Sequence, residues 1–421
     1  MTTTEIPERS VRPDEVHQRL SKHILADGLN VVMDIQRSRG AWLFDALRGR
    51  GMLDMFGCFS TIPLGFNHPK MLDPPFRERL LAAAVNKPSN SDLYSVEMAE
   101  FVEALARTLP PSLRGHMFFV EGGALAVENA LKTAFDWKRR MNERAGRPEK
   151  GEQIIHFEHA FHGRSGYTLG ITNTADPRKT QYFPQFDWPR VKSPHLRFPV
   201  TDEEIARVEA DEREAIEQIR QAVATHGHDI AGLILEPIQG EGGDNHFRTE
   251  FLQALRQLAD EHEFLLIFDE VQTGFATTGK WWCLEHFGVE PDVLAFGKKT
   301  QVCGIAAGPR IDEVDSVFAV SSRINSTWGG NLVDMIRCHR IIEIIEEEDL
   351  LANAERVGAE MVSAMRRWES THPDLVTNAR GRGMFSAFDL PTTEQRDELL
   401  KLMAEDDVLG LPSGHRAVRF R

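Results

Sequence analysis

Two adjacent lysines follow a short apolar stretch in the segment PDVLAFGKKTQVCG, residues 291–304. The apolar stretch predicts a buried strand that ends at Gly297, so Lys298 and Lys299 stand where the chain leaves the core. An amine at such a place can form a Schiff base with a carbonyl compound and can also carry a proton. The alternative for either lysine is an ordinary surface charge.

Carboxylates stand at the ends of two other apolar runs. Asp269 follows LLIF in LLIFDEVQTGF, and Glu236 follows LIL in LILEPIQGEGG, with Glu241 later in the same glycine-rich loop. A carboxylate at the end of a buried strand is costly unless a cation or a hydrogen-bond donor pairs with it. A helix cap or turn is the alternative for Asp269, and a solvated loop is the alternative for the two glutamates.

Two glycines separate an apolar run from a helical pattern in FFVEGGALAVENALK, residues 118–132. A glycine turn that enters a helix exposes backbone N–H groups and the positive end of the helix dipole, which suits a phosphate. The spacing is neither GxGxxG nor that of a Walker A loop, so a simple tight turn is the alternative.

Three histidines recur at every third position in HFEHAFHGRSGY, namely His156, His159 and His162. That spacing could place imidazoles on one face of a helix for a metal ion. The sequence around His156 is typical of a strand, however, and Gly163 would break a helix. We therefore favour an aromatic–His–Gly turn that lines a pocket, in which Phe161 can stack on a flat ring.

Together these groups suit one ligand, pyridoxal phosphate. Its aldehyde needs an amine for a Schiff base, and its pyridine nitrogen needs a carboxylate to stay protonated. Its ring needs a stacking partner, and its phosphate needs the N-terminus of a helix. The sequence contains a candidate for each role.

The elements that must bring these residues together follow an alternating pattern. Continuous apolar runs predict buried strands at 153–157, 231–236, 264–270 and 292–296, and amphipathic patterns predict helices at 126–141, 202–223 and 249–262. Such alternation is typical of an α/β fold with a mostly parallel sheet and helices on both faces. In these sheets ligands bind at the carboxyl ends of the strands, where the candidate residues stand.

The pattern changes after about residue 325, where we expect a smaller α/β domain. A long helix is predicted at 331–368, followed by a strand at 380–390 and another helix. A chain of 421 residues is too long for one ordinary core. We therefore predict an N-terminal segment packed with the small domain at 1–60, a large cofactor-binding domain at 61–325 and a small C-terminal domain at 326–421.

Charge and composition narrow the class of protein. The net charge is −15, so there is no basic surplus to neutralise the phosphates of a nucleic acid. The four cysteines include no CxxC pair, which favours reduced thiols over a disulfide framework. The sequence shows neither the apolar core of a signal peptide nor an apolar run long enough to span a membrane, so a cytoplasmic location is expected.

The order of several motifs resembles that of the class III aminotransferases of fold type I, which depend on pyridoxal phosphate. The motifs are EGGALAVENALK, FHGRSGY, EPIQGEGG, FDEVQTGF, PDVLAFGKKTQVCG and NSTWGGN, and the segment 40–69 matches as well. The resemblance covers about residues 35–421 and implies a large domain with a mostly parallel mixed sheet and a smaller α/β C-terminal domain. Within the family, GKKTQVCG, NSTWGGN and FHGRSGYTL are most similar to the branch that takes lysine as amine donor.

By this resemblance Lys298 is the Schiff-base lysine and Lys299 is a neighbour without a role. Asp269, the second catalytic residue, would pair with the pyridine nitrogen and also bind the cofactor. The other cofactor-binding residues that the resemblance implies are Gly123, Ala124, Phe161, His162, Glu236, Gln272 and, from the second subunit of a homodimer, Thr327.

The same resemblance implies L-lysine and 2-oxoglutarate as substrates. Transfer of the ε-amine of lysine would give L-glutamate and 2-aminoadipate 6-semialdehyde. Glu241 would mask Arg419 while the ω-amine of lysine enters, and would release it for the α-carboxylate of glutamate or 2-oxoglutarate. Arg164 would hold the distal carboxylate of either substrate, and Asn325 would tune the pocket.

One feature departs from the family pattern, because the chain stops at Arg421, two residues beyond Arg419. We therefore expect either that the sequence is a fragment or that the small domain is shortened, and that Arg419 is poorly held, with a surface charge as the alternative for this arginine. Three other functions stay open. They are an ω-aminotransferase with an ornithine, 4-aminobutyrate or diaminobutyrate donor, a protein that binds the cofactor without turnover, and a metal hydrolase built on the three histidines.

Overall fold

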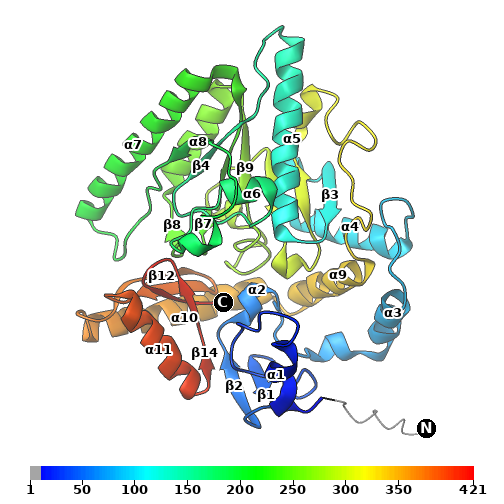
Figure 1. Cartoon of the computed structure of the whole chain (residues 1–421), viewed down its shortest axis with the longest axis vertical. Helices are drawn as coiled ribbons and strands as arrows, with labels where there is room; N and C mark the ends of the chain where they lie inside the picture. The colour runs from blue at the N-terminus through cyan, green and yellow to red at the C-terminus, as the bar shows by residue number, and fades with distance from the viewer. Residues whose placement is uncertain (1–10) are drawn as a thin grey trace.

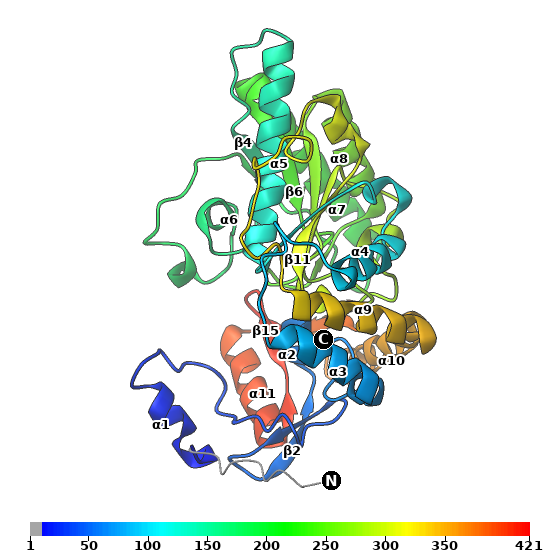
Figure 2. The same cartoon turned by 90° about the vertical axis from the view of Figure 1, so that its right-hand side faces the viewer.

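A computed structural model describes residues 11–421, and the first ten residues of the predicted N-terminal segment lie outside the described residues. Over the described range the chain forms four sheets, of which one has seven strands. The large sheet and its flanking helices occupy one end of the molecule, and the three-stranded and four-stranded sheets lie with α10 (Leu350–Thr371) and α11 (Thr393–Glu405) at the other end (Figure 1; Figure 2).

The large sheet has the strand order β3-β11-β10-β9-β6-β4-β5. Within the described residues, six of its strands share one direction and β11 alone runs in the opposite direction. The prediction of a mostly parallel sheet is therefore confirmed, and the four predicted apolar runs form β4, β6, β9 and β10. The bounds are β3 His116–Val120, β4 Gln153–Phe157, β5 Arg190–Val191, β6 Ile230–Leu235, β9 Leu265–Asp269, β10 Val293–Phe296 and β11 Cys303–Ala307.

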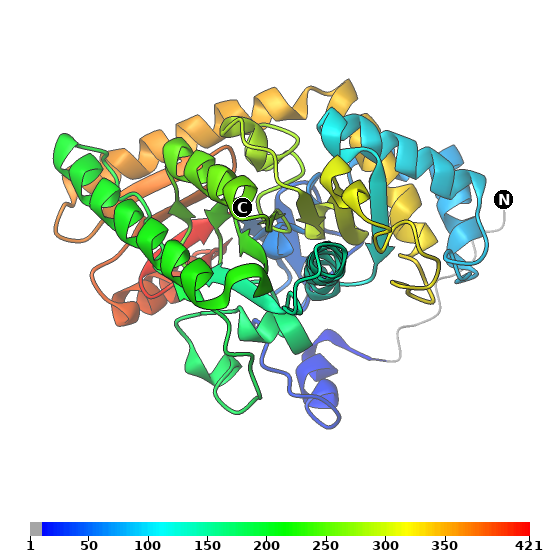
Figure 3. The same cartoon turned by 90° about the horizontal axis from the view of Figure 1, so that it is seen from above.

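Long helices cover both faces of this sheet, as the sequence pattern predicted. Helix α5 (Gly123–Arg144) packs on β6, β10 and β11, whereas α7 (Asp202–His226) packs on β4 and α8 (Thr249–Glu261) on β9. Seen from above, α5 is viewed end-on, and the two green helices lie across the sheet from it (Figure 3). The sheet is thus buried between two helical layers, which explains why its strands are apolar without alternation.

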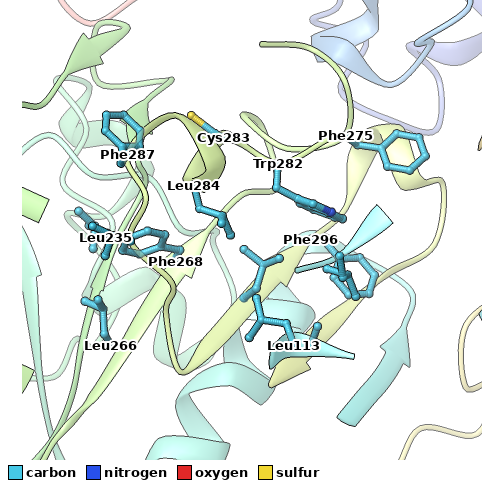
Figure 4. Packing of buried hydrophobic residues seen from close by; sticks show 14 of the residues in the cluster. Leu113, Leu235, Leu266, Phe268, Phe275, Trp282, Cys283, Leu284, Phe287 and Phe296 are labelled. Carbon is cyan, nitrogen blue, oxygen red and sulfur yellow. The ribbon is translucent and has the colours of Figure 1, made fainter. Parts of the chain in front are cut away.

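The strand β9 shows how one run of apolar residues serves two cores. Leu266 and Phe268 join the cluster that contains residues of α7 and α8, and part of that cluster is drawn in Figure 4. Leu265 and Ile267 join the cluster that contains residues of α5. Because successive side chains of a strand point to opposite faces, Asp269 is the first polar group at the end of a strand that is buried on both sides.

The predicted helix at 331–368 is wrong, because the structure has two helices there. Helix α9 (Leu332–Glu347) packs against α3 and α4, and α10 (Leu350–Thr371) packs against the small sheet. Between them Asp349 has a left-handed backbone with φ of 50°, a conformation that aspartate tolerates better than most residues. The helical periodicity continues through the break, so the sequence pattern did not reveal it.

The predicted strand at 380–390 is also wrong, because it is a hairpin of two strands. Strands β12 (Thr377–Arg382) and β13 (Phe385–Asp389) pair antiparallel around a turn at Gly383, whose φ is 56°. The small sheet is completed by β16 (Ala417–Phe420) and β15 (Leu411–Ser413), in the order β12-β13-β16-β15. The expected following helix is α11 (Thr393–Glu405).

A third sheet joins the two ends of the chain. Strands β1 (Trp42–Asp45) and β2 (Arg50–Asp54) form a hairpin, and β14 (Val408–Leu409) pairs with β2 in parallel. The described part of the N-terminal segment therefore contacts the C-terminal part of the chain, while the predicted domain boundaries stay a prediction. The remaining helices and strands are α1 Val16–Leu20, α2 Gly57–Ser60, α3 Pro74–Ala84, α4 Val96–Thr108, α6 Gly166–Gly170, β7 Ile238–Gln239 and β8 Asn245–His246.

Two further findings bear on the class of protein. None of the helices found in residues 11–421 is both long and apolar enough to cross a membrane. The four cysteines are free, and three of them are buried.

The contact between α10 and the hairpin turn yields a test of the fold. A Cβ at Gly358 would lie 2.0 Å from the carbonyl oxygen of Gly383, which is far too close. We expect Gly358→Ala to lower the free energy of unfolding by about 1–3 kcal/mol, the usual effect of overpacking. This loss should occur although alanine favours a helix over glycine by about 0.5–1 kcal/mol. Urea unfolding measures the change.

The matched control is the reverse exchange at the next position, Ala359→Gly, where the side chain is exposed. At this exposed position only helix propensity changes, so we expect the free energy of unfolding to fall by about 1 kcal/mol. A Gly358→Ala protein that is more stable than the parent would contradict the close packing of α10 on the hairpin.

Candidate active site

A cavity of about 660 Å³ lies at the carboxyl ends of the parallel strands, next to the N-terminus of α5. The predicted site residues line it, with the exception of Glu241, Asn325, Thr327 and Arg419. The lining residues are Thr61, Ile62, Gly123, Ala124, Phe161, His162, Gly163, Arg164, Glu236, Asp269, Val271, Gln272, Lys298, Gln301 and Cys303. The sheet therefore brings together residues that are far apart in the sequence.

Lys298 is half-buried and lines this cavity. The residue begins a short 3-10 turn, Lys298–Thr300, and has a left-handed backbone with φ of 53°. Burial lowers the pKa of the Lys298 amine below its ordinary value, and the carboxylate of Asp269 acts in the opposite direction. A larger fraction of the neutral, nucleophilic amine is therefore present at neutral pH than for a free lysine.

Lys299 is not a surface charge, so that alternative is wrong for both lysines. Its side chain is buried, and its Nζ donates a hydrogen bond of 2.6 Å to the backbone oxygen of Gln272. Burial holds the pKa of Lys299 well below the ordinary value, and the charge of Lys298 adds to this effect. The second lysine thus fixes the main chain at Gln272, a function that sequence reasoning missed.

Asp269 and His162 form a buried pair at the floor of the cavity. Oδ2 of Asp269 lies 2.7 Å from Nδ1 of His162, and its Oδ1 accepts a hydrogen bond of 3.0 Å from the backbone N–H of Val271. The Nε2 atom of His162 is buried and has no hydrogen-bond partner among the described residues. The imidazole therefore fixes the position of the carboxylate next to the cavity.

Glu236 connects two loops that form the cavity wall. Its Oε1 accepts from the backbone N–H of Phe161 at 2.9 Å, and its Oε2 accepts from that of Gly240 at 3.0 Å. Burial raises the pKa of Glu236 to about 7, which His162 opposes and Asp269 reinforces. Glu236 is therefore no solvated loop residue, and it fixes the backbone that carries Phe161.

The three histidines at every third position do not converge. His156 is buried in β4, where burial lowers its pKa to about 3, and His159 has its ring 6.1 Å from that of His195. Only His162 lines the cavity. Residues 11–421 contain no group of three or more His, Cys, Asp or Glu side chains arranged to hold a metal ion.

The start of α5 offers free backbone donors to the cavity. Gly122 precedes the helix with φ of 116°, and no side chain of the described residues caps it. Gly163 packs so closely on the helix start that a Cβ there would lie 2.5 Å from Cβ of Ala124. The N–H groups of Gly123 and Ala124 are thus available to an anion, and the loop carrying His162 is fixed against them.

Glu241 and Arg419 form an ion pair beside the cavity. Nη2 of Arg419 lies 2.9 Å from Oε2 of Glu241, and Nη1 lies 3.5 Å from Oε1 of Gln272, which lines the cavity. Arg419 is 2% exposed and sits in β16 between β13 and β15. The expectation that it is poorly held is therefore wrong, as is the surface-charge alternative.

A second cation, which sequence reasoning missed, contacts the same carboxylate. Nζ of Lys179 lies 2.6 Å from Oε1 of Glu241. Lys179 belongs to the 3-10 turn Pro177–Lys179 in the loop that connects α6 to β5. Burial raises the pKa of Glu241, but Arg419 and Lys179 outweigh burial, so the pKa lies below the ordinary value. No sequence signal points to Lys179, because it lies in an irregular loop far from Glu241 along the chain.

The other predicted substrate and cofactor residues lie apart from this network. Arg164 lines the cavity with an exposed side chain. Asn325 and Thr327 are exposed and do not line the cavity of this chain. The cavity residues that sequence reasoning missed include Gln301, whose Nε2 donates 2.8 Å to the backbone oxygen of Thr61.

Residues 24–421 match the family model described as aminotransferase class-III. The chain is 52% identical over 416 residues to the L-lysine-epsilon aminotransferase of Mycobacterium tuberculosis (strain ATCC 25618 / H37Rv), with 98% of this chain and 92% of that protein covered. It is 51% identical over 410 residues to the L-lysine-epsilon aminotransferase of Amycolatopsis lactamdurans, with 97% and 91% covered. Among solved structures it resembles lysine aminotransferase from M. tuberculosis in the internal aldimine form, with a TM-score of 0.94, 52% identity and 98% and 94% of the two chains covered.

The buried amine yields a prediction on pH. Because burial lowers the pKa of Lys298, the protein without cofactor should bind pyridoxal phosphate with a pH midpoint below the value of about 10.4 for a free lysine. Visible absorbance of the bound cofactor as a function of pH measures the midpoint. Lys298→Met, which removes the amine, should give no such band, and a midpoint at or above that of free lysine would show that the amine is not buried.

Proposed function

The chain belongs to the class III aminotransferases, and on this premise we propose that it transfers the ε-amino group of L-lysine to 2-oxoglutarate. The products are L-glutamate and 2-aminoadipate 6-semialdehyde. The observation that carries the choice of donor is the similarity along nearly the whole chain to aminotransferases named for lysine. The geometry of the site supports the proposed amino transfer itself.

Aminotransferases of this class use pyridoxal phosphate, and the cavity fits that cofactor. It offers a half-buried lysine, a buried carboxylate, an aromatic ring and the uncapped start of a 22-residue helix within one space. When bound, the cofactor supplies an aldehyde that reacts with amines and a ring that takes up electrons from the neighbouring carbon. The protein's contribution is to position the groups and to move the protons.

Lys298 would hold the cofactor in the resting protein and carry the proton during the reaction. When it is not bonded to the cofactor, Nζ of Lys298 would be a free amine in the cavity. Its pKa is lowered by burial, so Nζ can accept the proton from the substrate carbon that bears the amine. The same atom, Nζ of Lys298, would then donate this proton in a later step of the amino transfer.

Asp269 would keep the ring nitrogen of the cofactor protonated, since a buried carboxylate stabilises a positive charge beside it. Its position is fixed by His162 and by the backbone of Val271. The other lining residues would make the remaining contacts with the cofactor. Phe161 and His162 would contact its ring, and Gln272 would contact the ring hydroxyl. Gly123 and Ala124 would bind its phosphate, and Glu236 would hold the wall of the cavity.

Glu241 and Arg419 would let one site accept two kinds of substrate. In the structure the pair is closed, so the positive charge of Arg419 is masked and an ω-amine can enter. A dicarboxylate needs this arginine for its α-carboxylate, and Arg164 at the cavity would hold the distal carboxylate. That Arg419 is firmly held in β16 supports turnover over a protein that only binds the cofactor.

A second copy of the chain would complete the site. Thr327 and Asn325 are exposed in one chain, and large apolar side chains nearby are exposed as well, among them Tyr94 at 81% and Trp328 at 38%. The carbonyl oxygen of Thr327 accepts from the hydroxyl of Ser89 at 2.6 Å, so the two segments lie together. We propose that this surface meets its equivalent in a homodimer, where Thr327 reaches the partner's phosphate site and Asn325 tunes its pocket.

The proposed donor is tested by adding L-lysine to the purified protein with bound cofactor and without any keto acid. The visible band of the cofactor should disappear in a single turnover, and 2-oxoglutarate should restore it. Ornithine, 4-aminobutyrate and diaminobutyrate serve as comparison donors. If one of them removes the band faster than lysine at equal concentration, the proposal that lysine is the amine donor is wrong, whereas the proposed cofactor chemistry is supported.

The role of Arg419 is tested by Arg419→Met, which keeps much of the side-chain volume and removes the charge. We expect the KM for 2-oxoglutarate to rise about 10- to 100-fold, because a bidentate charged contact contributes about 1.5–3 kcal/mol. The half-reaction with lysine should change far less. An equal loss in both half-reactions would show that Arg419 acts by supporting the fold.

A further inference from the structure

The carboxylate of Glu241 lies between two cations that come from different parts of the chain. Its Oε2 contacts Nη2 of Arg419 at 2.9 Å, and its Oε1 contacts Nζ of Lys179 at 2.6 Å. Each oxygen therefore has its own charged partner. The side chain of Lys179 is 19% exposed and that of Arg419 is 2% exposed, so both contacts are largely shielded from water.

The main chain on both sides of Glu241 is closely packed. A Cβ at Gly240 would lie 2.6 Å from Oε1 of Gln272, and a Cβ at Gly242 would lie 2.0 Å from the carbonyl oxygen of His159. The carbonyl oxygen of Glu241 itself accepts from the backbone N–H of Gly414 at 2.8 Å. We therefore expect release of Arg419 to come from rotation of the Glu241 side chain and not from a shift of the loop.

If the carboxylate of Glu241 rotates away from Arg419, it needs another cation beside it during and after the rotation. A buried carboxylate that loses its only cation is strongly disfavoured, because its charge is then left unpaired away from water. The side chain of Lys179 is long and flexible, and it contacts the carboxylate oxygen of Glu241 that does not face Arg419. Lys179 can thus follow Oε1 while Oε2 leaves Arg419.

We propose that Lys179 is a positioning residue that holds Glu241 after it leaves Arg419, and thereby determines how readily the site accepts a dicarboxylate. This inference rests on the proposed function, in which Arg419 binds the α-carboxylate of the acceptor. With Lys179 present, the open arrangement keeps one ion pair intact. Without it, Glu241 stays on Arg419, and the entry of a dicarboxylate is disfavoured.

The test compares two variants of the same loop in the protein with bound cofactor. Lys179→Met removes the cation that contacts Glu241. Arg178→Met is the matched control, because Arg178 is the preceding residue, has the same charge and, within residues 11–421, forms an ion pair only with Asp176. The probe is glutarate, an unreactive dicarboxylate with the chain length of 2-oxoglutarate, and its binding is measured by calorimetry.

We expect Lys179→Met to weaken glutarate binding about tenfold, which corresponds to about 1.4 kcal/mol. The KM for 2-oxoglutarate should rise by a similar factor, while the half-reaction with lysine changes by less than about twofold. Lys179→Arg should restore glutarate binding, and Arg178→Met should leave it within about twofold of the parent. Unchanged glutarate binding in Lys179→Met, or an equal loss in both half-reactions, would overturn the proposal.

A second comparison separates action through Glu241 from a general attraction of dicarboxylates. In a Glu241→Gln background the masking charge is absent, so Lys179→Met should weaken glutarate binding by less than about twofold. A tenfold loss in that background would overturn the proposal, because Lys179 would then act on the ligand directly. The parent protein's reaction with lysine and 2-oxoglutarate is measured first, so failure of the proposed function is recognised independently of Lys179.

Discussion

Burial of the Lys298 amine is the constraint on which the rest of the site depends. Burial disfavours the protonated form of this amine, whereas the nearby carboxylates of Asp269 and Glu236 favour it and so raise the pKa of Lys298 against the effect of burial. These two carboxylates must in turn be buried and paired, which His162 and the backbone N–H groups of Val271, Phe161 and Gly240 achieve. The site is therefore one connected set of charges and donors.

The large sheet makes this arrangement possible. Parallel strands end at the same edge, so β6, β9 and β10 deliver Glu236, Asp269 and Lys298 to one space although the chain between them is long. The helices on the two faces bury each strand on both sides, and this burial is what shifts the pKa values of the groups at the strand ends. Burial of the strands between two helical layers therefore both stabilises the sheet and shifts the pKa values of the groups at the strand ends.

The loops that close the cavity are held by main-chain contacts too close for a side chain. Gly163 meets Ala124, Gly240 meets Gln272, and Gly297 meets Sγ of Cys303, where a Cβ would lie within 2.9 Å or less. Under the proposed function these closely packed loops would position the cofactor, and side chains such as that of Glu241 would adapt to the substrate. Through Arg419, Glu241 links the loop after β6 to the small sheet. The C-terminal strand would therefore contribute to the proposed chemistry as well as to the fold.

The sequence determined the alternation of strands and helices, the mostly parallel sheet and the polar residues at the strand ends, because burial on both faces leaves an apolar run that is visible in one dimension. Together with the resemblance to a family, this was enough to predict many, though not all, of the residues that line the cavity. It was not enough for the break at Asp349, where helical periodicity runs on without interruption, or for the hairpin turn at Gly383. Nor did it reveal the burial of Lys299 or the contact of Lys179 with Glu241. Those features depend on which elements pack together, and side-chain contacts between distant segments are decided only when the tertiary structure brings the segments into one place.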